Sequence, residues 1–124
     1  MNKYPYIARA KKSGSACVVF DYGKCVCVES KDSNFEIGEV YNVDESVLFN
    51  ITAEYLANTK VKIKSEEHAE FIIKLFNNAF DIGAVSRNPK WIYNKGEAGV
   101  TQQFHGEPSG ELKLITIPLP PKGS

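Results

Sequence analysis

The sequence has little of what usually reveals a chemical mechanism. Its 124 residues include three cysteines and two histidines, and its 15 lysines and arginines equal its 15 aspartates and glutamates. Balanced charge gives no general attraction to nucleic acid or to an anionic membrane. The apolar runs are far shorter than a membrane-spanning helix requires, and the N-terminus lacks an apolar segment followed by a cleavage site. We therefore expect no membrane association and no secretory signal.

The few cysteines are not spaced for metal or redox chemistry. Cys25 and Cys27 are separated by one residue, whereas zinc ligands and redox pairs usually have at least two residues between them. We expect the cysteines to be small buried hydrophobic residues, reduced in a cytoplasmic protein. Both glycine-rich phosphate-binding spacings are absent as well. The sequence therefore predicts no metal and no cofactor.

What the sequence does contain is one clear helix signal. Apolar residues recur three and four positions apart from Phe71 to Phe80, which makes a continuous stripe along one helix face. Ser65 is a suitable N-cap, and Glu66 and Glu67 follow where the helix dipole favours negative charge. We predict a helix over about 65–80 that buries its stripe against a sheet.

The remainder of the chain predicts short strands and turns. The expected strands cover residues 4–10, 16–20, 25–29, 35–41, 59–64, 90–93, 100–104 and 111–117, with one helical turn over 44–49. The fold class is therefore α+β, a single mostly antiparallel sheet with the main helix packed on one face. One globular domain over 1–122 is expected, and we interpret residues 123–124 as a cloning scar.

Two strands of this set are expected to form a central hairpin. A two-residue loop at Tyr22–Gly23 would place Cys25 and Cys27 on one face of the hairpin and Cys17 on the other. A three-residue loop would reverse which cysteines meet, because a shift of one residue moves every side chain to the opposite face.

The most suggestive candidate site combines cations with large aromatic side chains. It consists of Arg87, Lys90, Trp91, Tyr93 and Lys95. On a strand the two aromatic residues would share one face, with the cations around them. This chemistry suits stacking on a base or sugar and contact with a phosphate. The alternative is that the aromatic residues pack under the helix and the cations are solvated.

Two other classes of function remain open. The first is a small enzyme acting on a nucleotide or phosphate compound, in which His68 or His105 converges with a carboxylate such as Glu67 or Glu107. Against it, each histidine has a plainer interpretation as a surface or half-buried residue. The second is a nucleic-acid-binding module, which the neutral net charge disfavours. It would use Arg9, Lys11, Lys12, Lys60, Lys62 and Lys64.

Three segments give the chain a resemblance to a class of proteins. They are residues 35–39 (Phe-Glu-Ile-Gly-Glu), residues 61–69 at the start of the predicted helix, and the aromatic segment at Trp91. Their order resembles that of small accessory proteins of phages and mobile elements, including integron cassette proteins. The resemblance implies a non-enzymatic binding protein and transfers no functional residue.

The expected function combines this resemblance with the candidate site. We expect a cytoplasmic, non-enzymatic binding protein, without cofactor, that forms a homodimer or larger oligomer. Its partner would be a small nucleotide-like ligand or a host protein.

Overall fold

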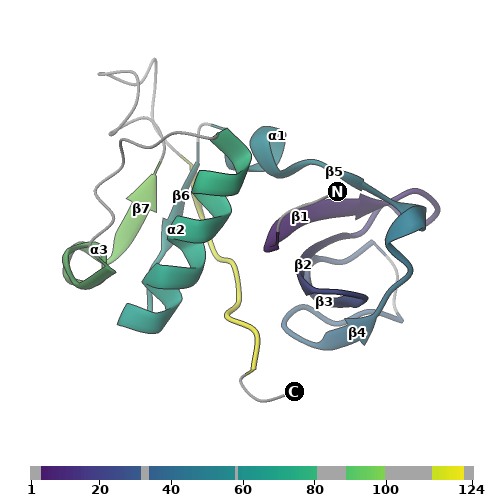
Figure 1. Ribbon diagram of the computed structural model, residues 1–124, viewed down its shortest axis with the longest axis horizontal. Coiled ribbons are helices and arrows are strands. Elements are labelled where there is room, and N and C mark those ends of the chain that lie inside the picture. Colours follow the sequence, from purple (N-terminus) through teal and green to yellow (C-terminus); the bar gives the residue numbers. More distant parts are fainter. Residues whose placement is uncertain (1–3, 32–33, 58, 81–88, 100–112, 122–124) are drawn as a thin grey trace. The chain divides into compact units, whose positions relative to one another are not determined.

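The structure is a computed structural model that describes residues 4–31, 34–57, 59–80, 89–99 and 113–121. Its contacts divide the chain into two compact units (Figure 1). Unit 1 is Met1–Thr52 with Pro118–Ser124, and unit 2 is Ala53–Ile117. The predicted α+β class is confirmed, but the strands form two sheets where the sequence suggested one. The prediction of a single domain over 1–122 stays a prediction.

Unit 1 is built on an antiparallel sheet of five strands in the order β4-β3-β2-β1-β5. A short 3₁₀ turn, η1 (Glu45–Val47), precedes the last strand. The strands are β1 (Tyr6–Ala10), β2 (Ala16–Asp21), β3 (Lys24–Glu29), β4 (Val40–Asn42) and β5 (Leu48–Asn50). The strand predicted over 35–41 is thus reduced to its last residues, and residues 44–49 divide between η1 and β5.

The short link between β4 and β5 forces this sheet to curl. These strands are its two edges, which in a flat sheet of five strands would lie about 19 Å apart. From Asn42 to Leu48 the chain could span at most about 22 Å when fully extended, but three of the five linking residues form the compact turn η1, which shortens the link to less than that separation. The sheet therefore curls, as Figure 1 shows, and gains a concave inner face.

A β-bulge in the hairpin decides which side chains line that inner face. The turn is as predicted, with Asp21 paired to Lys24, but the register shifts by one residue between Val19 and Asp21. Cys17 consequently lies opposite Cys27, and all three cysteines share one face. The prediction that Cys17 lies on the other face is wrong because the bulge inserts one extra residue in β2.

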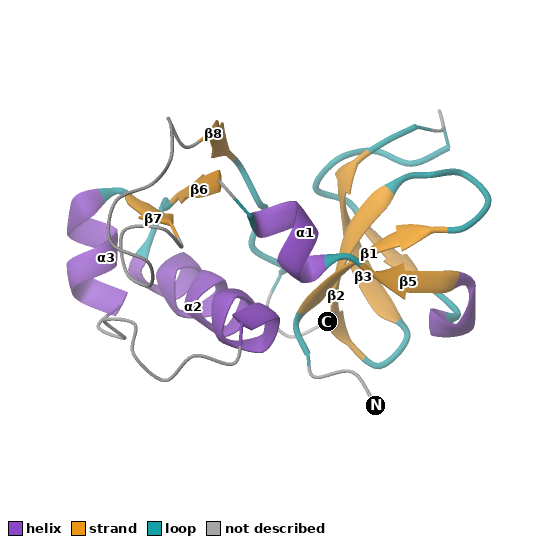
Figure 2. Ribbon diagram, turned by 90° about the horizontal axis from the view of Figure 1, so that it is seen from above, coloured by secondary structure: helices purple, strands orange, loops and turns teal. Residues whose placement is uncertain are grey.

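Unit 2 contains the smaller sheet and the main helix. Its sheet has the order β7-β6-β8, with β6 antiparallel to β7 and parallel to β8. The strands are β6 (Thr59–Lys62), β7 (Glu97–Gly99) and β8 (Lys113–Ile115). The helices are α1 (Thr52–Leu56), α2 (Glu66–Phe80) and α3 (Pro89–Lys95). Helix α1 begins at the boundary between the two units. Figure 2 shows α2 beside the sheet, and it contacts α3 and β7. The strand predicted over 100–104 lies outside the described residues.

The main helix α2 forms as the sequence predicts. The Ser65 hydroxyl oxygen accepts a hydrogen bond from the backbone N–H of His68 at 3.0 Å, which is the expected N-cap. Ile72 and Leu75 of the apolar stripe are completely buried, as is Ala69 in the turn before them. No helix in the described part of the chain is long and apolar enough to span a membrane.

Residues 90–93 form part of the helix α3, so the strand predicted there is wrong. Pro89 occupies the first helical position, where its fixed φ suits a helix and its missing N–H costs nothing. Gly96 follows the last turn with φ +81°, and its N–H donates to the Ile92 carbonyl at 3.0 Å. This is a common helix C-terminal motif. Ile92 alone anchors the described part of α3 in the core of unit 2.

Candidate functional site

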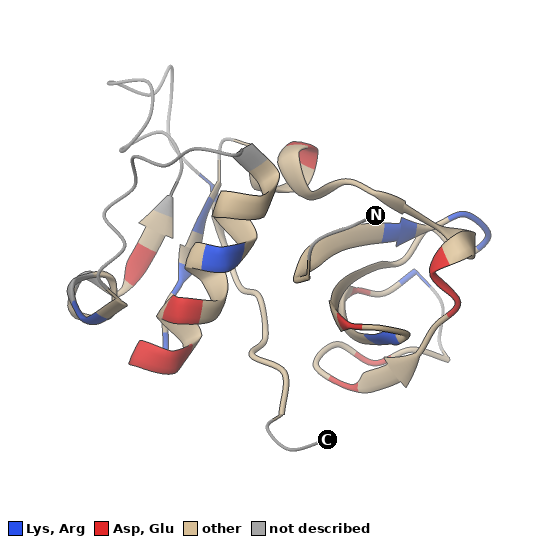
Figure 3. Ribbon diagram, viewed as in Figure 1, with Lys and Arg blue, Asp and Glu red and all other residues tan. Residues whose placement is uncertain are grey.

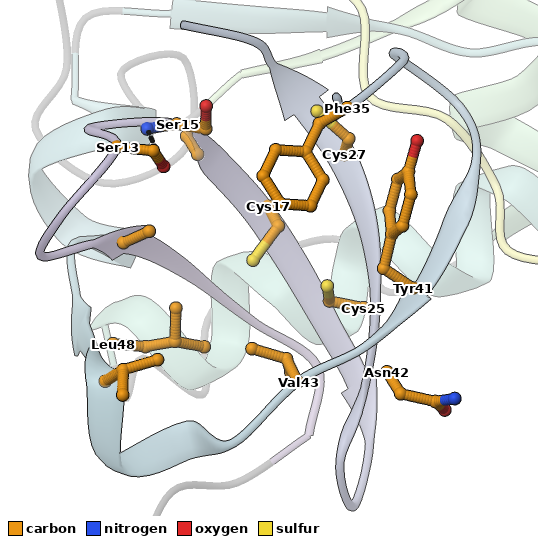
Figure 4. A pocket seen from close by; sticks show the side chains of 13 residues that line it. Ser13, Ser15, Cys17, Cys25, Cys27, Phe35, Tyr41, Asn42, Val43 and Leu48 are labelled. Atoms are coloured by element: carbon orange, nitrogen blue, oxygen red, sulfur yellow. Dashed lines mark hydrogen bonds between the residues drawn. The ribbon is translucent and has the colours of Figure 1, made fainter. Parts of the chain in front are cut away.

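The concave face of unit 1 encloses a hollow of about 160 Å³. Strands β2 and β3 carry its three cysteines, and residues of β1, β4, β5 and the connecting loops complete the wall (Figure 4). The lining residues are Ala10, Ser13, Ser15, Ala16, Cys17, Cys25, Cys27, Phe35, Tyr41, Asn42, Val43, Val47 and Leu48. None of these lining residues carries a charge.

Aromatic and aliphatic side chains hold the hollow open on the sides away from β2 and β3. Phe35 and Tyr41 meet edge to face, with ring centroids 5.0 Å apart and an interplanar angle of 85°. Tyr41, Val43 and Leu48 pack against the buried cluster that contains Cys17 and Cys25. The part of the wall that these side chains form is therefore apolar.

The hydroxyl groups of the lining residues already accept hydrogen bonds from backbone N–H groups. The Ser13 hydroxyl accepts from the N–H of Ser15 at 3.2 Å, and the Ser15 hydroxyl accepts from the N–H of Lys31 at 2.8 Å. The Tyr41 hydroxyl accepts from the N–H of Glu36 at 2.7 Å. A ligand bound in the hollow would thus contact mainly carbon and sulfur atoms.

Two of the thiols interact with each other. The sulfur atoms of Cys17 and Cys25 point toward one another, whereas that of Cys27 lies apart from both (Figure 4). Cys17 donates a hydrogen bond to the Cys25 sulfur, which together with burial raises the pKa of Cys17. The same bond lowers the pKa of Cys25, helped by the backbone N–H of Tyr41 and opposed by burial.

The structure places little of the predicted cationic aromatic site. Lys90 and Tyr93 are exposed on α3, Arg87 lies outside the described residues, and the side chains of Trp91 and Lys95 are not among those described. The strand face that Trp91 and Tyr93 were expected to share does not exist, because Pro89–Lys95 form a helix. The site itself stays a prediction.

His68 is part of the framework of unit 2. Its side chain is buried, its Nδ1 accepts from the N–H of Lys64 at 3.1 Å, and its Nε2 lies 2.6 Å from the Ile117 carbonyl oxygen. This pairing assigns the proton to Nε2. Burial lowers the pKa of His68, so the ring is neutral. Both ring nitrogens are thus engaged within the fold; His105 and Glu107 lie outside the described residues.

The predicted basic clusters are mixed with acidic groups. Both signs of charge occur among the described elements of each unit (Figure 3). Arg9 lies 3.5 Å from Glu29 and also donates to the Gly14 carbonyl, and Lys60 lies 3.3 Å from Glu97. These contacts neutralise the cation at one position of each predicted cluster.

The hollow is the feature that sequence reasoning missed. It depends on the bulge in β2 and on the short link between the two edge strands, and only the link length is visible in the sequence. Among the described residues, no group of three or more histidine, cysteine, aspartate or glutamate side chains is arranged to hold a metal ion. Protein-family models, curated proteins and solved structures yield no match to this chain.

Proposed function

We propose that this chain is a non-enzymatic binding protein whose ligand is a small, largely apolar molecule held in the hollow of unit 1. The observation that carries the proposal is the wall of that hollow, which is uncharged and formed mainly by carbon and sulfur atoms. Ligand sites in proteins are typically concave and lined by apolar and aromatic side chains.

The size of the hollow limits the ligand. A cavity of about 150 Å³ lined by apolar side chains accommodates benzene, and the hollow of unit 1 has a volume of about 160 Å³. The enclosed part of the ligand is therefore about one aromatic ring or a short branched chain. A phosphate group would find no cation among the lining residues to balance its charge.

The other parts of the expected function rest on the sequence alone. They are the mobile-element origin, the cytoplasmic location, the homodimer or larger oligomer, and the host-protein partner. A nucleotide-like ligand would bind at the segment 87–95, where Lys90 and Tyr93 are exposed. It is the weaker candidate of the two ligands. The engaged ring of His68 argues against the enzymatic alternative that uses this residue.

Two-dimensional NMR of the amide groups tests the proposal with three probes: benzene, indole and adenosine monophosphate. We expect benzene and indole to shift the signals of the lining residues, and adenosine monophosphate to leave them unchanged. Ala10→Leu should weaken the binding of indole at least tenfold, because the larger side chain fills the hollow. Ala53→Leu makes the same change at an exposed position of α1 and is the control. Equal binding of indole by both variants would contradict the proposal.

A further inference from the structure

The three thiols on the inner face of unit 1 are not equivalent. Cys17 lies directly opposite Cys27 in the ladder, and Cys25 lies diagonally across from Cys17. The N–H of Cys27 donates to Glu39 at 3.1 Å, and its carbonyl accepts from Gly38 at 2.8 Å. Cys27 thus makes its backbone hydrogen bonds on the side away from Cys17, and its sulfur lies apart from those of Cys17 and Cys25 (Figure 4).

The side chains, rather than the ladder positions, select the reactive pair. The sulfur atoms of Cys17 and Cys25 both lie in the wall of the hollow and face one another (Figure 4). Neither is sealed from solvent, since Cys17 is 9% exposed and Cys25 is 5% exposed. A molecule as small as a peroxide can reach both through the hollow that they line.

We propose that Cys17 and Cys25 are a modification site, at which a peroxide oxidises the two thiols to a reversible disulfide. This inference concerns the thiols themselves and does not depend on the proposed function. It goes beyond the expectation that the cysteines are merely small buried residues.

The reaction balances with hydrogen peroxide as the oxidant. Cys25 loses its proton to solvent, and its thiolate attacks one peroxide oxygen, so that an S–O bond forms, the O–O bond breaks and hydroxide leaves. The hydroxide takes the proton of Cys17 and becomes water. The Cys17 thiolate then attacks the sulfenic sulfur of Cys25, forming the S–S bond and releasing a second hydroxide, which the first proton neutralises. Both sulfurs are oxidised and the peroxide is reduced to two waters.

The roles of the two residues follow from their hydrogen bond. Cys25 accepts that bond and has the lowered pKa, so it supplies the nucleophilic thiolate. Cys17 holds the proton and resolves the sulfenic acid. Diagonal positions in an antiparallel pair have Cα atoms about 7–8 Å apart, slightly beyond the usual disulfide range of about 4.4–6.8 Å. The bond therefore requires a small shift of β2 against β3, and such bonds are readily reduced.

Intact-protein mass spectrometry of the full chain after exposure to a modest excess of hydrogen peroxide tests the proposal. We expect the mass to fall by two hydrogens, with one of the three free thiols left for alkylation and the change reversed by glutathione. Cys27→Ala should behave in the same way, whereas Cys17→Ala and Cys25→Ala should not lose two hydrogens. Persistent sulfenic or sulfinic acid without a disulfide, a disulfide between two chains, or no reaction would overturn the proposal.

Peptide mapping of the oxidised wild-type chain keeps the test decisive if a variant fails to fold. Trypsin cuts after Lys24 and so separates Cys17 from the peptide that holds Cys25 and Cys27. Fragmentation between Cys25 and Cys27 in the linked peptides then identifies the partner of Cys17. A Cys17–Cys25 link is expected, and a link through Cys27 would contradict the assignment. Because no ligand is present, failure here is distinct from failure of the binding proposal.

Discussion

The carboxylate of Glu45, in the turn η1, accepts a hydrogen bond from the hydroxyl of Tyr6 in β1 at 2.6 Å. Its second oxygen accepts from the Tyr4 hydroxyl at 2.8 Å and from the Gly23 N–H at 3.2 Å. One side chain thus ties the link between the edge strands to β1 and to the hairpin turn. This arrangement holds the sheet of unit 1 in its curled form and keeps the hollow open.

Replacing Glu45 should therefore loosen unit 1. Glu45→Ala removes the acceptor of three hydrogen bonds, one of them from the buried side chain of Tyr6. We expect the free energy of unfolding to fall by about 1–3 kcal/mol, measured by urea denaturation followed by circular dichroism. Glu39→Ala, at an exposed position of unit 1, is the matched control and should change stability by less than about 0.5 kcal/mol. Equal effects of the two substitutions would contradict this role.

The ionisation of Tyr4 gives a second, local measurement of the same contact. The hydrogen bond to Glu45 raises the pKa of Tyr4 to about 12. The side-chain carbon signals of Tyr4 can be followed by NMR as the pH is raised. Their titration midpoint should lie at a pH well above that of an ordinary tyrosine. In Glu45→Gln the pKa of Tyr4 should move back toward 10.0, its unperturbed value. An unchanged titration in this variant would show that Glu45 is not the cause.

His68 makes the stability of unit 2 depend on pH. Burial lowers the pKa of His68 in the folded state, so below about pH 6.5 the unfolded chain binds a proton that the folded chain does not. Stability should be fully present above about pH 6.5 and should decline below it by up to about 1.4 kcal/mol per pH unit. Urea denaturation of wild type and His68→Gln across pH 5 to 8 checks this. A slope as large in His68→Gln as in wild type would assign the effect to another group.

The N-cap of α2 offers a test of the main helix. Ser65→Ala removes the acceptor for the N–H of His68 and should lower the free energy of unfolding by about 1 kcal/mol. Ser65→Asp keeps an acceptor at this position and should retain most of the stability. Thermal and urea denaturation of both variants measure the difference. A loss in Ser65→Asp as large as in Ser65→Ala would contradict the capping role.

The elements that sequence predicted correctly are those specified by neighbouring residues. Ser65 and the apolar stripe define α2 within one short segment, and Gly23 defines the hairpin turn. The helix α3 carried a local signal too, Pro89 at its start and Gly96 at its end, but its aromatic residues favoured a strand. Composition outweighed the terminal residues in that prediction.

The features that sequence could not predict depend on distant residues. The bulge in β2 exists because of how its neighbours pair, and it alone places Cys17 beside Cys25. The parallel pairing of β6 with β8 joins Thr59 to Lys113, so nothing local indicates a second sheet. The hollow follows from the bulge and the curl together, and the candidate site of unit 1 was therefore absent from the sequence prediction.

The most direct test of the central claim is a crystal structure of the protein under xenon pressure. Xenon enters apolar cavities of this size without needing a polar partner. The account predicts a xenon atom in the hollow of unit 1, in contact with Cys17, Tyr41 and Leu48. A hollow filled by its own side chains, or by ordered water without xenon, would contradict a site for apolar ligands.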